Sequence, residues 1–542
     1  MSLPNSLFSM TSLPKAQFRA VVTCGFGSDL YPLVEPESAI SSDEDGETGA
    51  AAHHPVHGRK HGQTKALLPV AGKKMVDWVL ERVEEAGVFD ILVLTPASLA
   101  APMGHHLRAR RSAPSTSSSS SPTAKVELEE VPEDIARRGC VNIVRWAAEK
   151  SFIKTDFILL PCDLLLSPSG ANPVISLASL LDRHRNDDNL MTTLFSERAA
   201  GGVVEARKDG PPEILTIYDR KSSTLLDIRE MDEYDEDEVP LRTSLLARFP
   251  SPTLTTGLLP TQLYIFSSTI LPLILSETHS RRIRHMDNIR DLAGWISRLS
   301  WRNGGRDAIT YRAKGDVDRE DGLAMGRSTT QPPVLGSSGK GDAKSVFGHE
   351  SMPQTGANTP ALVSRGSWRA NEFAGAGAWR EGSAQTAAGK AAGSGGCKVV
   401  VWRAADGWCG RGNTVAGWVE MNRAALKLLP PSPPPTNTPS GVFISPDSFL
   451  HPSVYPNLGE KVGIKRCIIG KGCFIGKGTK LTNVVIMENV VIGENVKLDN
   501  CVVSNGVQIR DRATLKDCEM GRDVIVDTDA QVKNEQLVVE VE

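Results

Sequence analysis

The chain has 542 residues, a formal net charge of −3 and 40% hydrophobic residues, which is enough for about two or three domains and gives no global sign of nucleic-acid binding. No run of roughly 18 or more apolar residues occurs, and the N-terminus has no basic start followed by an apolar core, so we expect neither a membrane span nor a secretory signal. Nine cysteines without a CxxC pair argue against zinc and favour a reducing compartment, so we expect a soluble protein of the cytosol.

The first part of the chain alternates predicted strands and helices. A strand at residues 18–23 runs into a glycine pair, Gly25 and Gly27. Apolar side chains at helical spacing predict a helix at residues 75–86. The elements predicted after it are strands at 91–95 and 126–131, a helix within 132–150, and a strand at 157–160 that leads to Asp163. This alternation predicts a Rossmann-like α/β domain with a mostly parallel sheet, whose ligands lie beyond the carboxyl ends of the strands.

Four segments have compositions that cannot bury enough apolar area to offset chain entropy, about 1–2 kcal/mol per ordered residue. They are residues 38–62, 112–124 and 313–396, and a proline-rich linker at 430–441. After the third segment we expect the chain to re-enter the first domain with a strand at 398–402 and a helix at 414–429. The predicted domains are therefore residues 1–429 and 442–542, with the linker between them.

From Leu458 the sequence repeats every 17 residues, as two units of six and one of five. Each unit begins with an apolar residue: Leu458, Ile464, Ile469, Ile475, Leu481, Ile486, Ile492, Leu498, Val503, Ile509, Leu515, Met520, Val526 and Val532. A period near six fits neither a helix nor a two-faced strand, and it predicts a triangular parallel β-coil with these residues in its core. Cys467, Val484, Cys501 and Cys518 share the fourth place of the last unit, so we expect a ladder of small core side chains and no disulfide.

An ordered set of motifs resembles the nucleotidyltransferases that make nucleotide sugars. The set comprises the glycine turn after the first strand, "TKALLPVAGKKMVDWVLE" from Thr64, "LLPCD" ending at Asp163 and "TTGLLPTQLYIF" from Thr255. That family joins such a domain to a left-handed parallel β-helix of hexapeptide type. The resemblance implies that Gly25, Gly27, Lys65 and Asp163 occupy nucleotide-binding positions, with the lysine near the triphosphate and the aspartate holding magnesium.

Asp29 departs from the family pattern, because active enzymes carry an arginine on the triphosphate at this position. A pair of unit charges at about 4 Å is worth about 4 kcal/mol at an effective dielectric near 20, so the change opposes transfer strongly. The loop is also separated from Lys65 by a low-complexity insertion, and Ala66 replaces a proline. We therefore expect a vestigial pocket with no catalytic residue, no metal and no cofactor; weak nucleotide binding there remains open, and so does a turn-capping role for Asp163.

A closer resemblance is to the gamma and epsilon subunits of eukaryotic translation initiation factor 2B. Several stretches look like gamma, among them "FRAVVTCGFGSDLYPL", "FILLPCDLL" and "CGRGNTVAGWVEMNRAAL". The resemblance implies a non-catalytic scaffold or regulatory subunit that pairs with an epsilon-like catalytic subunit and with other subunits of the exchange factor. It also implies contact with the substrate initiation-factor GTPase complex. We expect the helical-repeat exchange domain of epsilon to be absent, and no direct contact with nucleic acid or membrane.

Two other functions remain open. One is an active sugar-nucleotide pyrophosphorylase of the mannose-1-phosphate guanylyltransferase type, against which Asp29 and the interrupted loop count. The other is a regulatory subunit of such an enzyme, which the gamma-like stretch after residue 396 disfavours. The acidic run at residues 230–238 is typical of a solvated loop, although it could meet a basic partner.

Overall fold

The computed structural model describes residues 18–34, 64–112, 124–168, 175–198, 214–231, 239, 241–302, 396–429 and 439–539. The predicted low-complexity segments lie outside these residues, apart from the ends at 112, 124 and 396, and so do most of the linker and the acidic residues 232–238. All the described elements belong to one compact unit.

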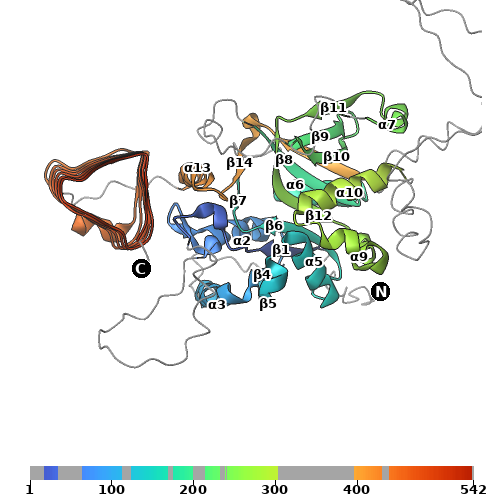
Figure 1. Ribbon diagram of the computed structural model, residues 1–542, viewed down its shortest axis with the longest axis horizontal. Helices are drawn as coiled ribbons and strands as arrows, with labels where there is room; N and C mark the ends of the chain where they lie inside the picture. Colours follow the sequence, from blue (N-terminus) through green and yellow to red (C-terminus); the bar gives the residue numbers. More distant parts are fainter. Residues whose placement is uncertain are drawn as a thin grey trace, which may run out of the picture. The chain divides into compact units, whose positions relative to one another are not determined.

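A ten-stranded sheet forms the centre of the first domain (Figure 1). Its strands, in spatial order, are β11 (Pro252–Thr255), β9 (Ile214–Asp219), β10 (Thr224–Glu230), β13 (Cys397–Trp402), β8 (Met191–Glu197), β12 (Leu258–Phe266), β6 (Asp156–Pro161), β1 (Phe18–Thr23), β4 (Asp90–Pro96) and β5 (Lys125–Val131). The pairings of β1 with β4 and β6, of β4 with β5 and of β8 with β13 are parallel. Only β12, β10 and β11 run against the other strands of this sheet. The sheet is therefore mostly parallel in direction, as predicted.

Helices cover both faces of the sheet because successive residues of a strand point to opposite sides. In β1, Val21 belongs to one apolar cluster, and Ala20 and Val22 belong to the other. The first cluster packs against α5 (Cys140–Glu149), α8 (Leu271–Leu275), α9 (Glu277–Arg284) and α10 (Ile289–Arg302). The second packs against α2 (Met75–Glu85), α3 (Ala97–Ser112) and α6 (Leu177–Asn186). A short α7 (Thr243–Arg248) packs near the sheet edge through Leu245.

The helix predicted within residues 132–150 is two helices, α4 (Glu133–Ala136) and α5. Gly139 separates them with φ 87°, a backbone conformation that glycine adopts without steric cost. A Cβ atom at this position would lie 2.3 Å from the carbonyl oxygen of Asp287. The break therefore depends on glycine twice, for its conformation and for its small size.

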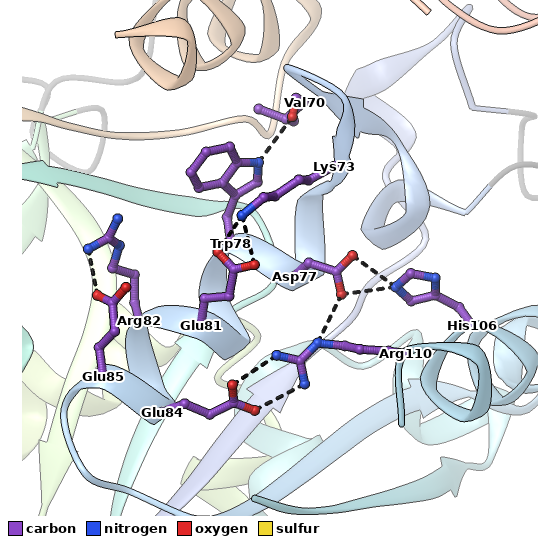
Figure 2. A network of polar contacts seen from close by, with 10 residues as sticks. All are labelled: Val70, Lys73, Asp77, Trp78, Glu81, Arg82, Glu84, Glu85, His106 and Arg110. Carbon is purple, nitrogen blue, oxygen red and sulfur yellow. Dashed lines mark hydrogen bonds and ion pairs between the residues drawn. The ribbon is translucent and has the colours of Figure 1, made fainter. Parts of the chain in front are cut away.

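A polar network fixes α2 against α3 and against the hairpin β2 (Pro69–Val70) and β3 (Lys73–Lys74) that precedes it (Figure 2). Arg110 of α3 donates two hydrogen bonds of 3.0 Å to Glu84, and His106 Nε2 lies 3.0 Å from Asp77. The Trp78 indole N–H donates to the carbonyl oxygen of Val70 at 3.0 Å. These contacts hold the start of α2 close to the segment that carries Lys65.

The C-terminal domain is a β-helix of three parallel sheets, drawn in orange to red in Figure 1. The first sheet contains β15 (Phe443–Ile444), β17 (Gly463–Lys465), β20 (Lys480–Thr482), β23 (Lys497–Asp499), β26 (Thr514–Lys516) and β29 (Gln531–Lys533). The second contains β16 (Phe449–Leu450), β18 (Ile468–Ile469), β21 (Val485–Ile486), β24 (Val502–Val503), β27 (Glu519–Met520) and β30 (Gln536–Leu537). The third contains β19 (Phe474–Ile475), β22 (Val491–Ile492), β25 (Gln508–Ile509) and β28 (Ile525–Val526).

The repeat builds the core that its pattern predicts. Residues 17 apart pair across neighbouring coils, as Ile475 does with Ile492, and every unit-starting residue is buried except Val532, which is half-buried. Cys467, Val484, Cys501 and Cys518 are all buried in this core, and the three cysteines are free thiols. Burial raises the pKa of Cys501 to about 12, which keeps it protonated and unreactive at neutral pH.

Within the described residues, no helix combines the length and the apolar character that crossing a lipid bilayer requires.

The neighbouring residues Val491 and Ile492 offer a matched test of the β-helix core. Ile492 is fully buried, whereas Val491 is 45% exposed. We expect Ile492→Ala to lower the free energy of unfolding by about 2–5 kcal/mol, because it leaves a cavity, and Val491→Ala to lower it by less than about 1 kcal/mol. Urea denaturation of the full chain measures both values. Equal losses in the two variants would contradict the assignment of inward and outward positions.

Candidate functional site

The candidate site lies where β1 and β6 end side by side. Thr23 pairs with Pro161 at the ends of these strands, and the Cys162 N–H donates to the Thr23 carbonyl oxygen at 3.1 Å. Both strands lead into buried cysteines, Cys24 and Cys162. Their thiols share a hydrogen bond, and this bond together with burial raises the pKa of Cys24 well above its ordinary value. The charged groups of the site are Asp163, which directly follows Cys162, and two cations from segments far from it in the sequence.

The glycine turn after β1 packs directly on Lys65. Gly27 has φ 85°, and a Cβ atom there would lie 2.8 Å from Cβ of Lys65. Lys65 begins the short 3-10 helix η2 (Lys65–Leu67). Gly25, by contrast, has open space around it, and Asp29 is exposed in the 3-10 helix η1 (Ser28–Leu30). The structure therefore brings Gly27 and Lys65 into contact.

Asp163 follows β6 and is fully buried between two cations. Lys65 Nζ lies 2.6 Å from its Oδ2 atom. The Arg411 guanidinium binds both oxygens, with Nε 3.0 Å from Oδ1 and Nη2 2.9 Å from Oδ2. Charge-assisted, two-pronged contacts of this kind are the strongest that an arginine makes with a carboxylate. We call these three residues the ion cluster.

A two-stranded antiparallel sheet brings Arg411 to Asp163, although Arg411 lies far from it along the chain. β14 (Gly407–Arg411) pairs antiparallel with β7 (Leu164–Pro168), which puts Arg411 opposite Leu164. The next residue, Gly412, donates its N–H to the Asp163 carbonyl oxygen at 2.8 Å. The Thr414 side chain then caps α13 (Val415–Leu426). Sequence reasoning did not assign Arg411 a role; the only signal was a charged residue between two glycines in "CGRGNT".

The electrostatic balance of the ion cluster favours the ionised carboxylate. Burial opposes ionisation of Asp163, but the charges of Arg411 and Lys65 and their hydrogen bonds outweigh it, so the pKa of Asp163 lies well below its ordinary value. Arg411 also lies near Cys140, whose pKa burial raises to about 11. The site thus holds one buried anion and two cations.

The ion cluster leaves Asp163 poorly suited to hold a divalent metal ion. Both carboxylate oxygens already accept hydrogen bonds from cationic groups, and an added ion would lie beside two positive charges. In the part of the chain that the structure describes, no group of three or more His, Cys, Asp or Glu side chains is arranged to hold a metal. The cluster fits a structural counter-ion role for Asp163 instead of a turn cap. Nucleotide binding by Gly25, Gly27, Lys65 and Asp163 stays a prediction.

A pocket lies at the carboxyl ends of β8 and β13, apart from the ion cluster. Its volume is ≈ 590 Å³, and its lining includes four arginines, two carboxylates and two threonines: Arg183, Arg198, Arg220, Arg403, Glu197, Asp406, Thr253 and Thr255. Guanidinium and hydroxyl groups around a concave surface suit an anionic, hydrogen-bonding ligand such as a sugar phosphate. None of the residues proposed from the sequence lines this pocket.

Comparisons with known proteins agree with this architecture. Residues 57–286 match the family model of the MobA-like NTP transferase domain, and residues 444–541 match that of the GMPPB C-terminal domain. The first domain has a nucleotidyltransferase fold. The chain is also similar to the translation initiation factor eIF2B subunit gamma of Schizosaccharomyces pombe (strain 972 / ATCC 24843), with 25% identity over 276 residues. That alignment covers 51% of this chain and 51% of the yeast protein, so the chain spans about half the length of this relative.

The ion cluster predicts a large effect of neutralising Asp163. We expect Asp163→Asn to lower the free energy of unfolding at pH 7 by about 3–5 kcal/mol, because Arg411 and Lys65 would remain buried without their counter-charge. Asp182→Asn is the matched control: Asp182 is 65% exposed and pairs with Arg185, so its loss should cost less than about 0.5 kcal/mol. Chemical denaturation measures both, and similar losses would contradict the role given to Asp163.

The lowered pKa of Asp163 also predicts a pH dependence. Below about pH 4 the unfolded chain protonates Asp163 near its ordinary pKa, while the folded carboxylate stays ionised. The stability that the ion cluster contributes is therefore complete above this pH and declines as the pH falls further. We expect the difference in unfolding free energy between the wild type and Asp163→Asn to shrink below about pH 4. A difference that stays constant down to pH 2.5, a value about one unit below the ordinary pKa, would contradict the prediction.

Proposed function

We propose that this protein is a non-catalytic scaffold or regulatory subunit of the guanine-nucleotide exchange factor for the translation initiation GTPase. The observation that carries the proposal is the ion cluster, in which Lys65 and Arg411 occupy both oxygens of Asp163. The similarity to the eIF2B gamma subunit supports the same role. On this proposal the transferase fold, whose acidic residue is neutralised internally, serves to bind and position other proteins and not to transfer nucleotides.

In this role the chain pairs with an epsilon-like catalytic subunit and with other subunits of the exchange factor in the cytosol. It raises exchange by positioning the catalytic partner and by binding part of the substrate GTPase complex. It contacts neither nucleic acid nor membrane directly. The chain itself does not touch the nucleotide that is exchanged.

Two features explain why the site is unsuited to nucleotidyl transfer. The attacked phosphate develops negative charge, which active sites stabilise with cations that are free to approach it. Here the cations Lys65 and Arg411 are already held by Asp163, and Asp29 adds an exposed negative charge to the turn after β1. Both features lower the positive potential available to a triphosphate.

The second candidate function is a sugar-nucleotide pyrophosphorylase, or a regulatory subunit of one. Its support is the arginine-lined pocket of ≈ 590 Å³ together with the two matching family models, for the MobA-like NTP transferase domain and the GMPPB C-terminal domain. A sugar phosphate could bind in this pocket without any transfer at Asp163. An assay of transfer separates the active enzyme from the non-catalytic functions.

The proposed role predicts a cooperative effect on guanine-nucleotide exchange. Release of labelled GDP from the initiation GTPase should be near background with this chain alone and measurable with the epsilon-like subunit. The pair should exceed the epsilon-like subunit several-fold, because the partner's catalytic domain is then positioned on its substrate. Equal rates with and without this chain, or strong release by this chain alone, would contradict the proposal.

The closed ion cluster predicts that the chain makes no nucleotide sugar. Incubation with magnesium, a nucleoside triphosphate and a sugar 1-phosphate should release no pyrophosphate above background. Asp29→Arg alone should not change this result, because Arg411 would still donate hydrogen bonds to the Asp163 carboxylate. Turnover that Asp163→Ala abolishes would establish the second candidate instead.

A further inference from the structure

The three sheets of the β-helix share one core but differ in what they present outward. On the second sheet, Ile468, Val485 and Val502 point outward, yet each is only 6% exposed. They belong to an apolar cluster that also contains Trp78 and Trp418 of the first domain. An outward apolar ladder on this β-helix is therefore covered by protein, and we call this sheet the covered face.

The first sheet needs no such cover because its outward positions are mostly charged. Lys480 and Lys497 begin their strands, and Lys465, Asp499 and Lys516 end theirs, all exposed to solvent. Charged side chains are usually exposed to water, so this sheet does not need to be covered by other parts of the protein. We call this sheet the charged face.

The third sheet, which we call the open face, carries an apolar ladder that is exposed. Its outward residues in coil order are Phe474, Val491, Gln508 and Ile525, and they pair directly across neighbouring coils. Phe474 is 48% exposed, Val491 45% and Ile525 56%. With coils about 4.8 Å apart, Phe474 and Val491 form one apolar patch, and Gln508 separates it from Ile525. Exposed apolar side chains gathered on one face are of the kind that marks a protein interface. The open face thus presents apolar residues outward, as the covered face does, but these residues are exposed.

The corner that follows the open face carries charges whose sign alternates along the coils. The corner carries Lys477 in the coil of Phe474 and Glu494 in the coil of Val491. It carries Arg510, Asp511 and Arg512 in the coil of Gln508, and Asp527 and Asp529 in the coil of Ile525, so the net charge of successive coils is positive, negative, positive and negative. All these side chains are exposed. Within the chain the arginines pair with the aspartates, Arg510 with Asp527 at 2.8 Å and Arg512 with Asp529 at 2.6 Å. Such exposed pairs are weak and can exchange partners.

This alternation is complementary to itself when the coil order is reversed. A two-fold axis parallel to the strands places the corner of one copy against the same corner of another, with the coils in opposite order. Lys477 then faces Asp527 and Asp529, and Glu494 faces the group Arg510, Asp511 and Arg512, whose net charge is positive. The same rotation brings Phe474 against Ile525. A single two-fold axis therefore places apolar residues against apolar residues and opposite charges against each other.

The alternative axis, parallel to the β-helix, brings like charges together. It places the corner before the open face against the corner after it, in the same coil order. Lys471 would then face Lys477, and Glu488 would face Glu494, whereas in the last coil Arg522 and Asp523 together would face Asp527 and Asp529. Like charges in register oppose association, so the charge pattern selects the antiparallel arrangement.

We propose that the open face pairs with the open face of a second copy of this chain, about a two-fold axis parallel to the strands. The ladder of outward residues spans three coil spacings, about 14 Å, so the dimer is weak and concentration-dependent. The pairing is independent of any role in nucleotide exchange. It buries Val491 near the axis, where it faces Gln508 of the second copy.

Sedimentation equilibrium of the purified full chain tests this dimer. Over about a hundred-fold range of concentration, the average mass should rise from that of the monomer toward twice that value. Val491→Asp should lower the association constant at least ten-fold, because it brings a carboxylate into the apolar patch of both copies. Lys497→Asp is the control, since Lys497 occupies the equivalent outward position of the same coil on the charged face. It should leave the association unchanged.

Charge reversal tests the orientation. Glu494→Arg should weaken the dimer, and adding Arg512→Glu to the same chain should restore it at least in part. Thermal unfolding of each variant shows whether the β-helix remains folded. A chain that stays monomeric throughout, a dimer that Val491→Asp does not weaken, or a pair that forms only with a different subunit would overturn the proposal.

Discussion

The contact between Asp163 and its two cations is the interaction on which the first domain depends. A fully buried carboxylate is costly unless it is paired and hydrogen-bonded, and here both oxygens are occupied. The three partners come from separate segments: the end of β6, the start of η2 and the end of β14. One ionic contact therefore ties the central sheet to the glycine turn through Lys65 and to α13 through the two-stranded sheet that carries Arg411.

The same contact affects the ligand site of the transferase fold. A nucleotidyltransferase fold places its ligand site beyond the carboxyl ends of the parallel strands, where Asp163 lies. In this chain that position is filled by side-chain cations, while the arginine-lined pocket lies elsewhere, beyond β8 and β13. The proposed scaffold role requires only the shape of the fold and its exposed surfaces. Fold similarity alone does not separate a scaffold from an enzyme.

The three sheets of the β-helix share one apolar core, but their outward residues differ. Every coil buries the same kind of apolar residue because the unit-starting positions point inward. The outward residue before each of them is free to vary, so one sheet is covered by the first domain, one is charged and one presents exposed apolar residues. Such a domain is stable through its repeat and specific through its outward residues.

Much of the fold could be predicted from the sequence because it rests on periodic patterns. The 17-residue repeat determined the β-helix core down to Cys501 and Val484, and the alternation of strands and helices determined the Rossmann-like domain. The motifs of the sequence also indicated Lys65 and Asp163, but they did not indicate Arg411, the second cation that binds Asp163. Arg411 lies 248 residues away, and only the pairing of β14 with β7 brings it to the carboxylate. Long-range pairing of this kind leaves no periodic signal in the sequence, and the same holds for the burial of one apolar ladder and the exposure of another.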